Sequence, residues 1–179
     1  QNGMSVRLQR PLDFLVVADH AEYLGLTTKL LAADPQLLAN PVGKRWHALL
    51  RANTARVIVS AAEASGYTKE MMVDSFMPQR EVLRDEAFAA SVWKEVAANA
   101  DRHNEPGRFS AFAGYEWSSM PEIDNLHRVV IFRDGFDRTS QVRAFSAFDS
   151  QDPEELWRYL ADYERKTGGE VLAIPHNSN

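Results

Sequence analysis

Three of the five histidines in this sequence stand at the ends of predicted strands, where side chains can do chemistry. His20 directly follows an apolar run, His176 follows another after one proline, and His127 opens a third strand-like segment. Glu116 lies near the end of the strand that should pair with the His127 strand. Because ligands and catalytic groups of α/β proteins gather at one end of the strands, we expect these side chains to converge. The candidate metal ligands are His20, Glu116, His127 and His176.

Imidazole and carboxylate groups together suit zinc, manganese or iron, and the sequence does not distinguish these ions. A carboxylate with histidines on each side also suits a two-metal site that activates water. Asp19 is either a ligand or an acceptor that fixes the tautomer of His20. Each residue alone has an ordinary alternative, such as a polar pair in a loop or a solvated strand-end glutamate. His47 and His103 fall in helix-like stretches and are expected to lie outside the site.

The composition excludes several other kinds of chemistry. The chain has 179 residues, a net charge of -5 and 45% hydrophobic residues, which is typical of one soluble globular domain. The absence of cysteine excludes disulfides, thiolate metal sites and cysteine nucleophiles. The acidic balance argues against nucleic-acid binding. No membrane span or signal peptide is recognised, which leaves cytoplasm and periplasm both open, and residues 1–3 resemble a vector remnant.

The order of the elements predicts an α/β domain. Two short apolar runs are typical of strands that are covered on both faces. Two longer strands, separated by a short loop, should pair antiparallel. A long helical stretch is interpreted as an insertion or cap within a single domain of residues 1–179. The predicted segments are strand 13–18, helical stretch 21–104, strands 109–117 and 126–132, helix 152–168 and strand 170–174.

Four segments carry a resemblance to known proteins: 11–25 with its Asp19-His20 pair, Gly114-Tyr115-Glu116-Trp117-Ser118, 125–132 and 174–179. In this order they resemble a bacterial family of uncharacterised proteins that is similar to the PHP (polymerase and histidinol phosphatase) superfamily of metal-dependent phosphoesterases. The resemblance implies a partial or distorted β/α barrel with metal ions at its mouth. The opening His-x-His and the late Asp-x-His of that superfamily are absent, so the chain looks like its central portion.

The resemblance also implies a role for each matched residue. His20 matches the histidine of the Asp-His strand end, and Glu116 matches the glutamate that bridges two metals. His127 and His176 match the two single histidines that complete one metal position. Two further residues fall where substrate contacts are expected, Asn177 and Asn179.

Two functions are therefore weighed from the sequence. The first is a phosphoesterase-type hydrolase that acts on a small molecule, such as a phosphate ester, with metal-bound water as the nucleophile. The alternative is a non-catalytic remnant that serves as a metal-binding or protein-interaction module. In either case, a homo-oligomer that covers exposed strand edges is expected.

Overall fold

The computed structural model describes residues 8–54, 83, 85–121 and 124–176. The chain divides into two compact units. One unit combines residues 1–22 with residues 93–179, and the other consists of residues 23–92. The first unit contains all the candidate ligands, so its sheet is the element that positions them.

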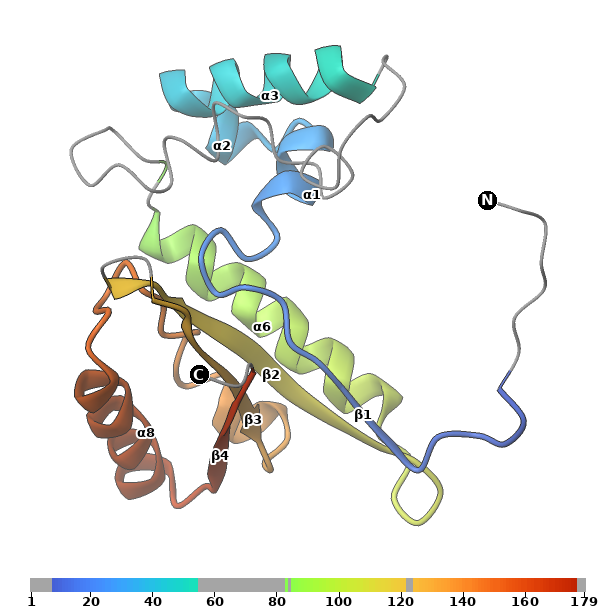
Figure 1. Cartoon of the computed structure of the whole chain (residues 1–179). Helices are drawn as coiled ribbons and strands as arrows, with labels where there is room; N and C mark the ends of the chain where they lie inside the picture. The colour runs from blue at the N-terminus through green and yellow to red at the C-terminus, as the bar shows by residue number, and fades with distance from the viewer. Residues whose placement is uncertain (1–7, 55–82, 84, 122–123, 177–179) are drawn as a thin grey trace. The chain divides into compact units, whose positions relative to one another are not determined.

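A four-stranded mixed sheet forms the centre of the first unit (Figure 1). The strands lie side by side in chain order, β1-β2-β3-β4. Strand β1 runs parallel to β2, whereas β2 with β3 and β3 with β4 are antiparallel. The bounds are β1 (Phe14–Val17), β2 (Ser110–Ser119), β3 (Leu126–Phe132) and β4 (Val171–Pro175).

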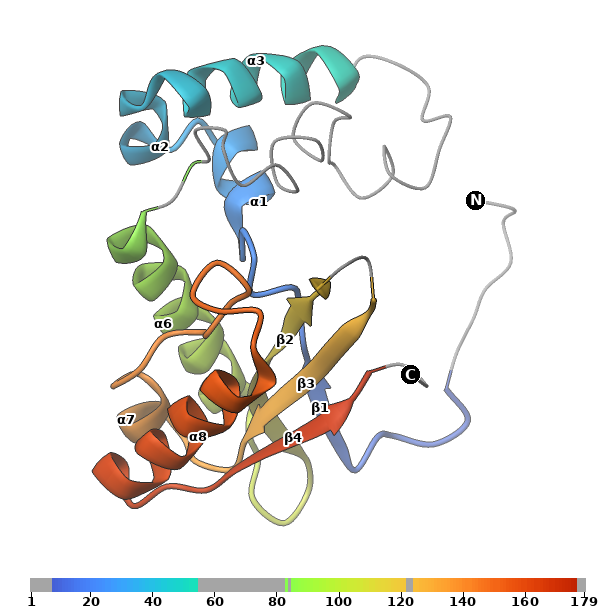
Figure 2. The same cartoon turned by 60° about the vertical axis from the view of Figure 1, so that its left-hand side comes forward.

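Helices cover one face of this sheet (Figure 2). They are the later turns of α6 (Glu86–His103), the short α7 (Phe136–Thr139) and α8 (Pro153–Thr167). The ring of Trp93 on α6 lies 5.6 Å from that of Tyr115 and 5.3 Å from that of Phe132. Tyr163 on α8 packs edge-on against Phe132 at 4.8 Å. This buried aromatic cluster holds both long helices to β2 and β3.

The other face of the sheet carries the candidate site. Side chains alternate between the two faces along a strand, so Glu116 and Ser118 point away from the face that Tyr115 shares with the helices. Ser118 pairs with His127 in the antiparallel register, which places His127 on the same face as Ser118. Large apolar side chains on this face are exposed, including Phe14 (64%) and Leu172 (57%).

The end signals of α8 explain why the sequence predicts it well. The Asp152 carboxylate accepts a hydrogen bond from Glu154 N at 2.9 Å, and Pro153 occupies the first turn. Gly168 ends the helix in the left-handed conformation, with φ of +65°. The structure confirms this helix, the helical character of the last part of the predicted stretch 21–104, which forms α6, and the antiparallel pairing of β2 with β3.

The second unit is helical where it is described. It contains α1 (Leu26–Leu31), α2 (Pro35–Ala39), α3 (Pro41–Thr54) and the first turns of α6. Trp46 is fully buried, and its ring meets that of Tyr23 at 5.5 Å. The rest of the predicted helical stretch, residues 55–82, lies outside the described residues. None of the helices in the described part of the chain is long and apolar enough to cross a membrane.

The expectation of a partial or distorted β/α barrel is wrong. The sheet is open, with β1 and β4 as its two edges, and β3 runs antiparallel to both of its neighbours. A β/α barrel instead needs parallel strands joined by crossover helices. The two runs predicted as strands covered on both faces are these edge strands, and they are largely exposed. An apolar run predicts a strand, but it does not show which helices or strands pack against that strand.

We expect Phe132→Ala to lower the free energy of unfolding by about 3–5 kcal/mol, because Phe132 is fully buried among three aromatic rings. Urea unfolding followed by tryptophan fluorescence measures the change. Leu172→Ala, at a side chain that is 57% exposed, is the control and should change stability by much less. Equal losses in the two variants would contradict the assignment of the core to the helical face.

Candidate metal centre

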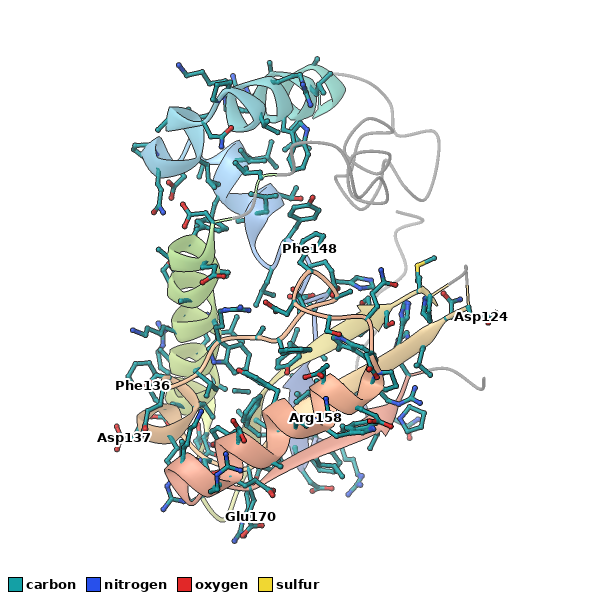
Figure 3. All side chains as sticks on the ribbon, turned by 90° about the vertical axis from the view of Figure 1, so that its left-hand side faces the viewer. Asp124, Phe136, Asp137, Phe148, Arg158 and Glu170 are labelled. Atoms are coloured by element: carbon teal, nitrogen blue, oxygen red, sulfur yellow. The ribbon has the colours of Figure 1, made fainter. Side chains whose placement is uncertain are left out.

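One edge of the sheet gathers the predicted ligands, because four strand ends meet there. β1, β2 and β4 run in the same direction, and β3 runs against them, so the ends of three strands meet the start of β3. Figure 3 shows Asp124, which precedes β3, and Glu170, which precedes β4, at opposite ends of the sheet. The candidate site lies at the Asp124 end.

Main-chain hydrogen bonds fix the strand ends that carry these residues. The main-chain N–H of Glu116 donates to the Asp19 carbonyl at 2.8 Å, and Ala21 N donates back to the Glu116 carbonyl at 2.8 Å. His20 is thereby held beside Glu116 in a parallel bridge. On the other side, the N–H of His176 donates to the His127 carbonyl at 3.1 Å. The ladder thus brings the four predicted ligands to one place.

Glu116, His127 and His176 form a group that could hold a metal ion. One ligand atom from each residue can be chosen so that all lie within 4.8 Å of one another. Oε1 of Glu116 lies 2.7 Å from Nδ1 of His127 and 3.4 Å from Nδ1 of His176. The side chain of Glu116 is only 7% exposed, so its charge is largely shielded from water. A buried carboxylate needs a compensating charge or hydrogen-bond donors, and Nδ1 of His127 lies at hydrogen-bond distance from it.

The donor set fits a divalent ion. Nε2 of His127 is buried and has no hydrogen-bond partner among the described residues. A buried polar atom needs a partner, and a metal ion near this nitrogen would supply one. One carboxylate oxygen with two imidazole nitrogens suits zinc, manganese or iron and leaves coordination positions for water or substrate. The structure does not select among these ions.

His20 lies next to this group but not within it. Its Nδ1 hydrogen-bonds to Oγ of Ser118 and lies 3.9 Å from Oε1 of Glu116. The His20 side chain is 55% exposed, compared with 13% for His127. Asp19 contributes through its main-chain carbonyl, which accepts from Glu116. The predicted substrate contacts, Asn177 and Asn179, lie outside the described residues.

Sequence reasoning missed Glu22. Its Oε1 accepts hydrogen bonds from Ala147 N at 2.6 Å and from Ser118 N at 3.5 Å. Its Oε2 lies 4.0 Å from Nδ1 of His20. The signal was present, since Glu22 stands two residues after His20, but a glutamate beyond the end of a strand is usually a solvated residue.

The loop that contains Ala147, which donates to Glu22, is held by an ion pair between Arg143 and Asp149. Arg143 donates to both carboxylate oxygens of Asp149, at 2.8 and 2.6 Å. Burial opposes ionisation of Asp149, but hydrogen bonds from Arg143 and Ser146 outweigh it and lower the pKa of the carboxyl group. Burial also raises the pKa of Tyr159 to about 12, so its hydroxyl stays protonated and donates to the Arg143 carbonyl. Phe148 marks this loop in Figure 3.

Comparison with known families identifies the family of the chain. Residues 1–179 match the family described as "Protein of unknown function (DUF3604)", and the chain therefore belongs to that family. Neither the curated proteins nor the solved structures contain a match to the chain.

We expect the double variant His127→Ala, His176→Ala to bind Zn²⁺ or Mn²⁺ more than about 100-fold more weakly than the parent chain, because two of three closely spaced ligands are lost. Isothermal titration calorimetry on metal-stripped protein measures the affinity. His103→Ala is the matched control, since His103 lies on α6 and bonds to the Asn99 carbonyl. Unchanged affinity in the double variant would place the ion elsewhere.

Asp149→Asn should destabilise the first unit by about 1–3 kcal/mol at pH 7, because a charge-assisted pair with Arg143 is lost. The folded-state pKa is lowered, so this stabilisation is present above the unfolded value of about 4 and is lost as the pH falls through the folded value. Urea unfolding between pH 7 and pH 3 should therefore show the two proteins becoming similar in acid. Asp162→Asn, which breaks exposed ion pairs on α8, should have little effect. A pH-independent difference would contradict the ion-pair explanation.

Proposed function

We propose that this member of the DUF3604 family is a metal-dependent hydrolase of the phosphoesterase type that acts on a small molecule. The observation that supports the proposal is the grouping of a buried glutamate with two histidines at one end of an open sheet face. The similarity of the strand-end segments to the PHP superfamily gives the reaction class. That relationship is part of the proposal.

Some residues of the chain would bind the ion, and others would shape its surroundings. Glu116 and the imidazoles of His127 and His176 would bind the ion, and the main-chain ladder keeps them in place before it arrives. A divalent ion held there would supply Lewis acidity and lower the pKa of a coordinated water toward neutrality. Ser118 orients His20 at the rim, where an exposed imidazole can exchange protons with solvent.

Local charge supports a strict dependence of substrate binding on the ion. The carboxylates of Glu116 and Glu22 lie close to His20, at 3.9 and 4.0 Å from its Nδ1. An anionic phosphate ester entering this region without a cation would be repelled by both carboxylates. A divalent ion held by Glu116, His127 and His176 would supply positive charge that offsets these carboxylates. Metal binding should therefore precede phosphate binding.

The test is hydrolysis of p-nitrophenyl phosphate and bis(p-nitrophenyl) phosphate by metal-stripped protein with Mn²⁺ or Zn²⁺ added back. We expect activity only with metal, and a loss of at least about 100-fold in the His127→Ala, His176→Ala variant, because the ion supplies most of the catalysis. The His103→Ala control, prepared in parallel, should keep full activity. Equal activity in the double variant would indicate a contaminating enzyme.

A second outcome favours the alternative function. If the parent chain binds metal through Glu116, His127 and His176 but hydrolyses neither ester, the centre serves a metal-binding or interaction module. The exposed apolar residues on the same sheet face, such as Phe14 and Leu172, are the observation that favours this second candidate. Metal content and hydrolysis must therefore be measured on the same preparation.

A further inference from the structure

We infer that a cavity at the other end of the sheet from the candidate metal centre binds a small organic cation, namely an ammonium group on a short apolar chain. The cavity has a volume of about 330 Å³ and is bounded by the last turns of α6, the start of β2 and the turn that follows β3. It includes Ser110, the first residue of β2, whereas Glu116 stands near the end of that strand. The cavity is therefore separate from the metal centre, and the inference does not depend on the proposed hydrolase.

Small side chains leave the space for this cavity. Ala97 and Ala100 line it from α6. Ala111 and Ala113 line it from β2, on the face that Tyr115 shares with the helices. Larger apolar residues at these positions would fill the gap between helix and strand. Because the volume is at the small end of the range for ligand sites and the walls are apolar, the cavity fits the body of a small molecule.

Charge balance selects the sign of the ligand. Three charged side chains line the cavity, and two of them have a counter-charge. Arg133 is paired with Glu170, and Asp134 is paired with Arg138 at 2.7 Å. The third, Asp101, forms no ion pair within the described part of the chain. Its carboxylate leaves the cavity with a net negative charge, which favours a cation.

The carboxylate of Asp101 is held in position by the turn after β3. Its Oδ1 accepts a hydrogen bond from Phe136 N at 3.3 Å. Gly135 permits this approach, because a Cβ at that position would lie 2.6 Å from the same oxygen. The hydrogen bond uses only one oxygen, so the other can accept from a ligand. A carboxylate that is already oriented loses less conformational freedom on binding, which strengthens the interaction.

The end of α6 adds to the negative potential. The helix ends at His103, two residues after Asp101. The last carbonyl groups of a helix lack donors within the helix and give its C-terminus a partial negative charge. Arg102 and His103 are the basic residues of this turn, but both bond to Asn99 and neither lines the cavity. An ammonium group, with three hydrogen-bond donors and a positive charge, matches this end of the cavity.

The probe is n-butylammonium, because it joins a short apolar chain to an amine that is charged at pH 7, as lysine is. In an amide NMR titration of the full chain, we expect saturable shifts at residues that line the cavity, such as Ala111 and Gly135. Asp101→Asn keeps an oxygen acceptor but removes the charge, and it should weaken binding at least about 10-fold. Ala100→Leu should abolish binding, because the larger side chain fills the cavity. Butanol, which has the chain without the charge, should bind at least about 10-fold more weakly.

Asp162→Asn is the matched control, since it removes an exposed carboxylate from α8, and it should bind the probe as the parent chain does. The His127→Ala, His176→Ala variant should also bind normally, so the test is independent of the metal centre. The amide spectrum of each variant reports whether it is folded, and Asp101→Asn decides the question if Ala100→Leu disturbs the fold. No saturable shift at the lining residues of the parent chain would overturn the inference. Equal affinity in Asp101→Asn, or equal binding of butanol, would overturn it as well.

Discussion

The buried carboxylate of Glu116 is the constraint on which the rest of the site depends. A charge that is shielded from water must be surrounded by donors or cations, and the sheet supplies them from both of its neighbouring strands. Strand β3 brings His127 from one side, and the chain after β1 brings His20 from the other. Strand β4 adds His176 through its pairing with β3. A parallel pair and an antiparallel pair on either side of β2 are therefore both needed to enclose one side chain.

An element can be predicted from the sequence when the residues that determine it lie close together in the chain. Helix α8 is predicted by residues at its own ends, namely Asp152 and Pro153 at its start and Gly168 at its end. The pairing of β2 with β3 follows from a short loop between two strand-like runs. The convergence of His20, Glu116, His127 and His176 could be anticipated because strand ends meet at sheet edges. These features need only neighbouring residues or one rule of chain geometry.

The wrong predictions concern contacts that no local pattern specifies. The apolar run of β1 indicated a covered strand, but burial depends on which elements pack on it, and Phe14 and Val17 are 64% and 60% exposed. The barrel was inferred from strand-end residues that a mixed open sheet arranges equally well. Glu22 was overlooked because its partner, Ala147, is 125 residues away in the sequence. Only the folded chain shows that this glutamate is partly buried, with a side chain that is 16% exposed.

Glu22 is also the last residue of the first unit before the chain continues into residues 23–92. Its carboxylate is fastened to the main chain at Ala147 and Ser118, on two segments distant in sequence. Residues 23–92 therefore follow a residue whose side chain accepts hydrogen bonds from two other segments of the first unit. The polypeptide that follows His20 is thus attached within the first unit by the side chain of Glu22, two positions later in the sequence.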